Sequence, residues 1–198
     1  MCARYYVPQT EVDSDLEPIL IEAENRGRLH QEHFVLKRGE IRPGDYAAVL
    51  AKSRLSQTPS PFPMQWGFHT DQGLVFNARS ETAHSKPLFQ DSFQHRRCLI
   101  PMMAYFEWDH RQRPMLKYRF EPQETSYACF AGLYRFEGQN PVFTILTRNA
   151  APSIAQFHDR MPVILPRNIQ DEFLLGSVSD ADHALTLGIE QLSFGAVW

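Results

Sequence analysis

The chain has 198 residues, of which 43% are hydrophobic and 22% charged, and it carries a formal net charge of −3 at pH 7. This length and composition exclude a disordered or fibrous chain, and we expect one globular domain over residues 1–198. The small negative charge gives no general affinity for nucleic acid, so any such binding requires a local cationic patch.

Neither the apolar runs nor the cysteines indicate a membrane, an export route or a metal. No apolar run approaches the ~20 residues that cross a bilayer, and the N-terminus lacks the regions of a signal peptide. The cysteines, Cys2, Cys98 and Cys129, show no CxxC spacing, and the histidines show no HxxxH or HExxH pattern. We therefore expect a cytoplasmic protein with reduced thiols, no membrane partner, no metal site and no cofactor.

The first predicted element is a helix over residues 16–28 (LEPILIEAENRGR). Either Ser14 or Asp15 can cap its first turn, where Pro18 is tolerated because the N–H that proline lacks has no helical partner there. Gly27 is expected to stop the helix, because glycine is common at helix C-termini.

Strands dominate the rest of the prediction. Residues 33–37 and 46–51 are expected as short strands on either side of a turn, and the Pro- and Ser-rich residues 53–63 as a loop. From Trp66 onward, β-branched and aromatic runs alternate with turn residues. The strands expected there lie within residues 73–79, 98–101, 104–108, 115–120, 126–136, 141–147 and 161–165.

Two further helices are expected in the C-terminal third of the chain. One is a short helix over residues 150–157, and the other covers residues 169–176, with Asn168 as its cap and Gly176 as its stop. Together the elements predict an α+β fold whose core is a largely antiparallel, curved β-sheet or open β-barrel with peripheral helices. Such a fold does not identify a function.

Polar residues fall at unusual places on these strands. Side chains alternate along residues 74–79 (LVFNAR), so Asn77 and Arg79 share one face. Glu107 is a carboxylate in the middle of the aromatic strand AYFEW, and His158 follows a short helix in FHDRMP. Taken singly, each has an ordinary explanation as an edge amide, a rim carboxylate or a surface histidine.

A set of segments also occurs together in a fixed order: MCARYY, MQWGF, VFNARSET, FQHRRCLIP, YFEW, ILTRNA and FHDRMPVIL. In this order and at this spacing they resemble the SRAP family, first labelled SOS response-associated peptidases and now understood as abasic-site processing proteins. The resemblance extends from Cys2 to about Leu165. It implies an SRAP domain that senses abasic sites in single-stranded DNA during the DNA damage response.

The resemblance also implies an active site. Met1 would be removed, and Cys2, as the new N-terminus, would form a covalent crosslink to an abasic deoxyribose. By motif, Asn77, Glu107 and His158 resemble the active-site polar residues of the family. The partner would be single-stranded DNA containing an abasic site, and we expect a monomer that lies on the nucleoid when bound to DNA.

The residues that would hold the DNA follow from the same motifs. Arg4, Arg79 and Arg160 resemble the DNA-phosphate contacts of the family. Trp66 resembles part of the wall against which flanking bases lie, and an aromatic ring of this kind can stack on an unpaired base.

The chemistry of an N-terminal cysteine fits this role. A ring-opened abasic site carries an aldehyde, which a 1,2-aminothiol traps as a Schiff base and then as a thiazolidine. The α-amino group has a pKa of about 7.7 to 8.0, so a useful fraction is neutral at cellular pH. We expect His158 to assist opening of the sugar, Glu107 to transfer protons if it is buried against Phe106 and Trp108, and Asn77 to orient the amine or a sugar hydroxyl.

Other functions remain open at this stage. Because the Schiff base precedes β-elimination, a lyase side reaction is chemically reasonable. Cys2, His158 and Glu107 could instead serve a cysteine peptidase that acts on its own leader, although no motif supplies an oxyanion hole. A non-catalytic module that shields single-stranded DNA is the third interpretation, and it would not need a thiol at position 2.

Overall fold

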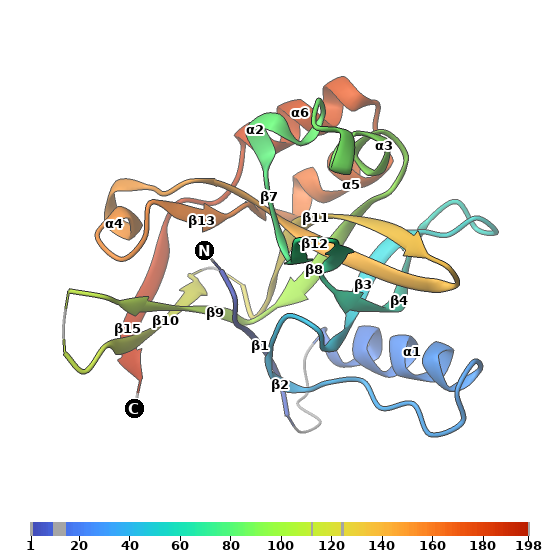
Figure 1. Cartoon of the computed structure of the whole chain (residues 1–198), viewed down its shortest axis with the longest axis horizontal. Coiled ribbons are helices and arrows are strands. Elements are labelled where there is room, and N and C mark those ends of the chain that lie inside the picture. The colour runs from blue at the N-terminus through green and yellow to red at the C-terminus, as the bar shows by residue number, and fades with distance from the viewer. Residues whose placement is uncertain (1, 10–14, 112, 124, 198) are drawn as a thin grey trace.

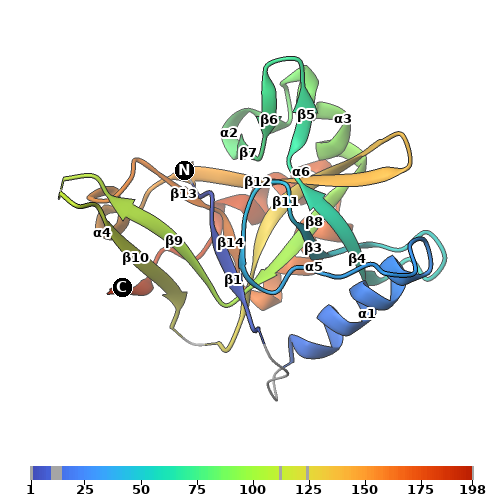
Figure 2. The same cartoon turned by 60° about the horizontal axis from the view of Figure 1, so that its bottom comes forward.

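The computed structural model describes residues 2–9, 15–111, 113–123 and 125–197. A β-barrel forms its centre, a second sheet packs beside the barrel, and helices lie around the rim (Figures 1 and 2). The predicted α+β class with a largely antiparallel β core is therefore confirmed. None of the helices in the described ranges is both long and apolar enough to cross a membrane.

The barrel consists of strands that pair in a closed ring. β3 pairs with β4 and β8, β8 with β11, and β11 with β12, all antiparallel. The ring closes where β12 meets β4 in parallel, with Phe143 opposite Trp66. Closure removes the free edges that an open sheet would leave. The barrel strands are β3 (Tyr46–Lys52), β4 (Pro59–Trp66), β8 (Arg97–Met102), β11 (Ala128–Glu137) and β12 (Asn140–Asn149).

Short strands extend this ring, and a hairpin lies beside it. β7 continues beyond β4 along β12, while β13 and β14 pair with β12 and β11. β5 and β6 form a separate two-stranded hairpin. These strands are β5 (Phe68–Thr70), β6 (Gly73–Val75), β7 (Asn77–Arg79), β13 (Arg160–Pro162) and β14 (Ile164–Leu165).

The second sheet is antiparallel and has the strand order β15-β10-β9-β1-β2. Only Met103 separates β8 of the barrel from β9 of this sheet, and its N–H donates to the carbonyl of Tyr6 over 2.9 Å. The two sheets therefore meet at a fixed corner. The strands of this sheet are β1 (Tyr5–Val7), β2 (Gly39–Ile41), β9 (Ala104–Asp109), β10 (Leu116–Pro122) and β15 (Leu192–Val197).

The helices lie at opposite ends of the barrel. α1 (Glu17–Arg28) packs its buried face, with Leu20 and Ala23, against β3 and β4. The others gather near the far end, except α4, which lies beside β13 (Figure 1). They are α2 (Ser80–Ala83), α3 (Pro87–His95), α4 (Pro152–Ala155), α5 (Arg167–Leu175) and α6 (Val178–Thr186).

Helix boundaries were the less accurate part of the prediction. The N-cap of α1 is Leu16, with no side-chain cap, while Asp15 pairs with Arg167 at 3.0 Å and Ser14 lies outside the described residues. α1 continues past Gly27, where a Cβ would lie 2.2 Å from a ring carbon of Phe34, so this glycine provides room for packing. Asn168 lies inside α5, whose N-cap is Pro166, and Gly176 is the C-cap as expected.

One strand prediction and one loop prediction were also wrong. Residues 33–37 form no strand, and residues 53–63 are only partly a loop, because β4 begins at Pro59. The prolines at 59, 61 and 63 face Lys52, Leu50 and Ala48 of β3, respectively, at alternate positions along the ladder. Backbone N–H groups alternate sides along a strand, so all of these prolines can leave the β3–β4 hydrogen bonds intact.

Candidate functional site

Cys2 precedes β1, from which Ala3 and Arg4 separate it, and its side chain is 0% exposed. β1 is paired on both edges, with Tyr5 opposite Ile41 of β2 and Tyr105 of β9, so the chain entering it is held in place. The thiol donates to the carbonyl of Arg4 over 3.7 Å. The N-terminal segment is thus a fixed part of the core, while Met1 and its predicted removal lie outside the described residues.

Asn77 joins Cys2 from a distant part of the chain. β7 runs parallel to β12, with Asn77 opposite Ile145, and the Asn77 Nδ2 donates to the Cys2 carbonyl over 2.8 Å. Its Oδ1 is buried without a hydrogen-bond partner in the described ranges. That oxygen is therefore available to accept a hydrogen bond from an amine or a hydroxyl.

Glu107 is the third residue of this corner. It is 4% exposed, and burial raises its pKa from 4.5 to about 6. Burial also raises the pKa of the Cys2 thiol well above its usual range, and the charge of Glu107 raises it further. Cys2, Asn77 and Glu107, which come from three separate segments, define what we term the Cys2 corner.

Glu107 is buried, but not against Phe106 and Trp108. These two side chains project from the opposite face of β9, where the ammonium of Lys117 lies 4.0 and 5.6 Å from their ring centroids. Glu107 shares its face with Tyr105, whose ring stacks on Phe120 at 4.9 Å. The pKa of Glu107 therefore rises because it enters the core beside Tyr105, and not because those two aromatic rings cover it.

Two tyrosines belong to the same buried region. Burial raises the pKa of both Tyr5 and Tyr105, and negative charge on Cys2 would raise it further in each. Both hydroxyl oxygens are buried without hydrogen-bond partners among the described residues. The thiol thus lies among neutral hydroxyl groups and one carboxyl group, in surroundings that disfavour a thiolate.

His158 lies on the connection between α4 and β13. Its Nδ1 accepts the backbone N–H of Arg160 over 2.9 Å and lies 2.7 Å from Asp159 Oδ1. The Arg160 N–H requires Nδ1 to accept, whereas the Asp159 carboxylate favours a proton on Nδ1, and the protonated ring that this carboxylate favours also carries a proton on Nε2. Burial lowers the pKa of His158, and the charge of Asp159 partly offsets this. The chain before β1 runs beside β13 in both views (Figures 1 and 2).

Arg160 does not fit its expected role as a phosphate contact. It is 8% exposed, and its guanidinium donates to both carboxylate oxygens of Glu81 over 2.6 and 2.7 Å. It also donates to Asn149 Oδ1 over 2.6 Å and to the Thr147 carbonyl over 2.7 Å. This arginine ties α2, β12 and β13 together, and its hydrogen bond is the main reason why the pKa of Glu81 is lowered.

Arg79 and Arg4 differ in how far their guanidinium groups are available to bind a phosphate group. Arg79 is exposed, and Ala78 between it and Asn77 is buried, so the predicted alternation holds and the two polar side chains share a face. Arg4 is 28% exposed and lies 3.0 Å from Glu40, which also binds Lys117. Burial would raise the pKa of Glu40, but these cations lower it below its ordinary value.

Trp66 also lacks the exposed position that a residue needs to stack on a DNA base. It is 0% exposed, its indole N–H donates to the Phe76 carbonyl over 2.8 Å, and its ring stacks on Phe143 at 6.0 Å. It is a core residue at the closure of the barrel and cannot reach a base in this structure. Trp108 and Tyr6, by contrast, are partly exposed and lie beside cations, with the Arg119 guanidinium 4.7 Å from the Tyr6 centroid, and Phe62 and Tyr127 share these two properties.

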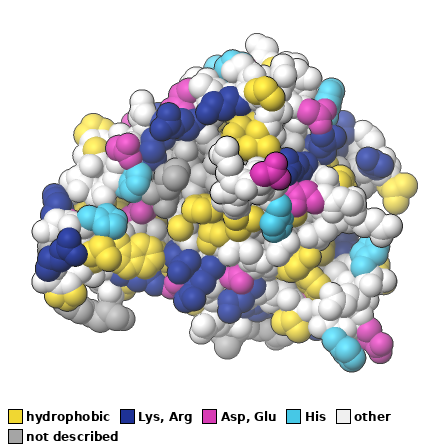
Figure 3. All heavy atoms as spheres, in the orientation of Figure 1, with side chains coloured by type: hydrophobic (Ala, Val, Ile, Leu, Met, Phe, Trp, Pro, Cys, Tyr) yellow, Lys and Arg dark blue, Asp and Glu magenta, His cyan; other side chains and the backbone are white. Residues whose placement is uncertain are grey.

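The sequence interpretation missed Lys117 and Arg119, which strand pairing places beside aromatic side chains. Lys117 lies opposite Trp108, and Arg119 lies opposite Phe106. On the face seen in Figure 3, Lys and Arg side chains gather on both sides of a strip of hydrophobic side chains. Alternating polarity in MLKYRF would have indicated that one face of this strand is cationic.

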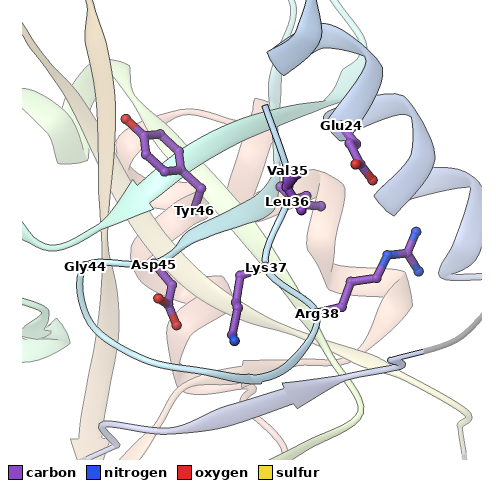
Figure 4. A pocket seen from close by; sticks show the side chains of 8 residues that line it. All are labelled: Glu24, Val35, Leu36, Lys37, Arg38, Gly44, Asp45 and Tyr46. Carbon is purple, nitrogen blue, oxygen red and sulfur yellow. The ribbon is translucent and has the colours of Figure 1, made fainter. Parts of the chain in front are cut away.

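The larger of the two cavities described does not coincide with the Cys2 corner. It has a volume of about 610 Å³ and lies between α1 and the segments around residues 35–38 and 44–46 (Figure 4). Its lining carries both signs of charge, including Glu24, Asp45 and Lys37, and none of the predicted site residues. In the described part of the chain, no group of three or more His, Cys, Asp or Glu side chains is arranged to hold a metal ion.

Comparison with known proteins gives the same family as the motifs. The family described as "SOS response associated peptidase (SRAP)" matches residues 1–194. The chain is 33% identical to the abasic site processing protein YoqW of Bacillus subtilis over 120 residues, which are 57% of this chain and 53% of YoqW. It is 27% identical to the abasic site processing protein YedK of Escherichia coli over 187 residues, which are 90% of this chain and 82% of YedK. The matched part thus spans about half of YoqW.

A solved structure supports the fold independently. A crystal structure of a protein from Bacteroides thetaiotaomicron aligns with a TM-score of 0.77 and 17% sequence identity, covering 100% of this chain and 92% of that one. At this identity, the likeness concerns the fold alone.

Proposed function

Because the chain belongs to the SRAP family, we propose that it processes abasic sites in single-stranded DNA by forming a covalent crosslink through Cys2 once Met1 has been removed. The observation that carries the proposal is the Cys2 corner. Asn77 holds the Cys2 carbonyl, and the buried Glu107 carboxyl acts electrostatically on the Cys2 thiol. Burial of a carboxyl group costs free energy, so the position of Glu107 in β9, where its charge acts on Cys2, favours a role in the chemistry over a role in stability.

The protonation state of the Cys2 thiol indicates which group of Cys2 reacts first. Since burial and Glu107 both keep the thiol protonated, the α-amine is the better first nucleophile. Its nitrogen adds to the C1′ aldehyde of the ring-opened sugar, and loss of one water molecule gives a Schiff base. The sulfur then bonds to C1′, and the thiol proton passes to the nitrogen. The product is a thiazolidine, with water as the only molecule released and no change of oxidation state.

The polar residues have distinct roles in these steps. Glu107, with a pKa of about 6, can accept the proton that the amine loses and return it when the hydroxyl group leaves as water. His158 can donate from Nε2 to the ring oxygen of the sugar as the ring opens. The unpartnered Oδ1 of Asn77 orients the amine or a sugar hydroxyl group.

DNA would lie across the cationic surface beside this corner. Arg79 shares a face with Asn77, so a phosphate bound there lies next to the reacting sugar. Arg4 and Lys117, gathered around Glu40, provide a second cationic position. Trp108 replaces Trp66 as the ring on which a flanking base would stack.

The test uses a single-stranded oligonucleotide with one abasic site and denaturing electrophoresis. We expect a stable shifted band with the wild-type protein and no band with Cys2→Ala. The matched control is Cys129→Ala, because Cys129 is equally buried but lies in the apolar wall of the barrel. Intact mass must show that Met1 is absent from the crosslinked protein, and a crosslink formed by protein that retains Met1 would contradict the proposal.

The other functions give different results in the same experiment. Cys2-dependent cleavage of a peptide without a DNA adduct would support a peptidase. Affinity for DNA that is unchanged in Cys2→Ala, again without an adduct, would support a shielding module. Strand scission 3′ to the lesion would support the lyase side reaction, because β-elimination starts from the same Schiff base. Crosslinking with no scission at any time would exclude that side reaction.

A further inference from the structure

A second cavity lies away from the Cys2 corner. Its volume is about 440 Å³, and it forms where the connection between β3 and β4 meets the C-terminal ends of α3 and α5. In both views this connection and the N-terminal end of the chain lie on opposite sides of the molecule (Figures 1 and 2). The cavity is therefore separate from the site proposed above.

The charge of this cavity is unusual for a chain with a net charge of −3. All of the charged residues that line it in the described part of the chain are basic, namely Lys52, Arg54, Arg96 and Arg97, together with His95. Lys52 and Arg54 are exposed, whereas the Arg96 side chain is 30% exposed and its Nε is buried without a hydrogen-bond partner in the described ranges. Cations gathered around a cavity favour an anionic ligand.

Carboxylates near the cavity interact with Arg96 and Arg97 but not with Lys52 and Arg54. Asp91, which is 65% exposed, pairs with Arg96 outside the cavity lining. Asp180 and Asp182 interact with Arg97 through their charges, and Asp180 is held by the cap of α6. No carboxylate therefore balances Lys52 and Arg54 among the described residues that line the cavity.

Arg97 binds carbonyl groups at the C-terminal ends of two helices that border the cavity. Carbonyl groups at helix C-termini repel anions. The Arg97 guanidinium donates to the carbonyls of Phe93 and Gln94 in α3 over 2.8 and 3.3 Å. It also donates to the carbonyls of Phe173, over 2.6 Å, and Gly176 at the end of α5. Because these carbonyl groups accept hydrogen bonds from the positively charged Arg97, they no longer repel an anion bound in the cavity.

An aromatic ring completes the site. Phe136 is 52% exposed, and its ring lies 6.0 Å from that of Tyr134, centroid to centroid. Burial raises the pKa of Tyr134, and the charges of Arg96 and Arg54 partly offset the effect. A flat apolar ring beside convergent cations is the arrangement that binds a base together with its phosphate.

We propose that this cavity binds a nucleoside phosphate, with the phosphate between Arg54, Arg96 and Lys52 and the base against Phe136. The nucleotide can be free, or it can be part of a strand that is bound elsewhere on the protein. The inference does not depend on Cys2, so its test uses the Cys2→Ala protein, in which crosslinking cannot contribute.

The test is residue-resolved ¹H–¹⁵N spectroscopy with inorganic phosphate, dTMP and an undamaged short oligothymidylate as separate ligands. We expect saturable shifts at the amides of Arg96 and Phe136. Lys52→Glu combined with Arg54→Glu should weaken binding at least about tenfold, because charge-assisted hydrogen bonds are lost. Phe136→Ala should weaken binding of dTMP and leave binding of inorganic phosphate unchanged.

The matched control places the same charge change elsewhere, as Lys37→Glu combined with Lys86→Glu, two exposed lysines outside this cavity. This protein should keep the shifts at Arg96 and Phe136. Equal affinity for dTMP and the oligonucleotide would identify a free nucleotide as the ligand, and saturation by the oligonucleotide alone would identify a strand. Absence of saturable shifts with all three ligands, or shifts that persist in the Lys52 and Arg54 variant, would overturn the proposal.

Discussion

The Cys2 corner and the wall of the barrel each bury a cysteine completely, yet they surround it differently. Cys2 lies with Asn77 and Glu107, whereas Cys129 lies within β11, between Leu165 and Pro101 of the neighbouring strands. Burial raises the pKa of both thiols, to about 12 for Cys129, with Arg167 lowering it slightly. Burial alone therefore does not make a reactive site, and the polar neighbours that can move protons are what distinguish Cys2.

The roles of the amine and the thiol of Cys2 can be separated by one substitution. Cys2→Ser keeps a small second residue and the α-amine but removes the sulfur. We expect complete loss of the crosslink that survives denaturation, while borohydride reduction of the mixture should still trap the Schiff base. Electrophoresis with and without reductant measures both species. A stable crosslink formed by Cys2→Ser without reductant would show that the thiazolidine ring is not the product.

The second comparison concerns the two tryptophans. Trp66→Ala should lower the free energy of unfolding by about 3–5 kcal/mol, because it opens a cavity where the barrel closes. Trp108→Ala should cost much less stability and instead weaken binding of single-stranded DNA about tenfold, through loss of stacking. Urea unfolding and fluorescence anisotropy measure the two quantities. Equal effects of both substitutions on DNA affinity, after correction for the unfolded fraction, would contradict the assignment.

The third test removes the ionisable group of the Cys2 corner. Glu107→Gln should slow crosslinking about 100-fold at neutral pH, because its proton transfer is lost. The matched control, Glu121→Gln, changes a carboxyl group of the same sheet that pairs with Arg119. Crosslinking by this control should be unchanged, and an equal loss in both variants would remove Glu107 from the mechanism.

The same substitution has a predictable effect on stability. The pKa of Glu107 is raised in the folded state, from 4.5 to about 6, so the fold prefers the protonated form. The wild-type protein should therefore lose up to ~2 kcal/mol of stability from this group as the pH rises from about 4.5 through about 6, and Glu107→Gln should not. Urea midpoints across this range measure the difference. A wild-type midpoint that rises relative to that of the variant would contradict the sign.

The smallest expected effect concerns Arg79. Arg79→Ala should weaken DNA binding only a few-fold and reduce the slope of log affinity against log salt by about 0.7, the value for one contact to a single strand. Stability should be unchanged because the side chain is exposed. Lys86→Ala is the control for an exposed cation close in sequence. An unchanged salt slope in Arg79→Ala would remove this phosphate contact.

Much of the strand pattern could be read directly from the sequence, because alternation and aromatic runs report which face is buried. The alternation of side chains that puts Asn77 and Arg79 on one face is present in the structure, and so is the strand that carries Glu107. Residues 33–37 and the start of β4 were misread, because single-sequence patterns do not show whether a partner strand exists. Prolines 59, 61 and 63 are compatible with a strand only because of how β4 pairs.

Motif order and side-chain period are local properties of the chain, so the family, the α+β class and the residue types of the site could be predicted from them. The closure of the barrel through β4 and β12 depends on the tertiary structure, as do the burial of Trp66 and Arg160 and the accessibility of Trp108 and Arg79. Whether an arginine or a tryptophan meets solvent depends on which distant segments supply its partners. Glu81 for Arg160 and Phe143 for Trp66 lie about 80 residues away along the chain.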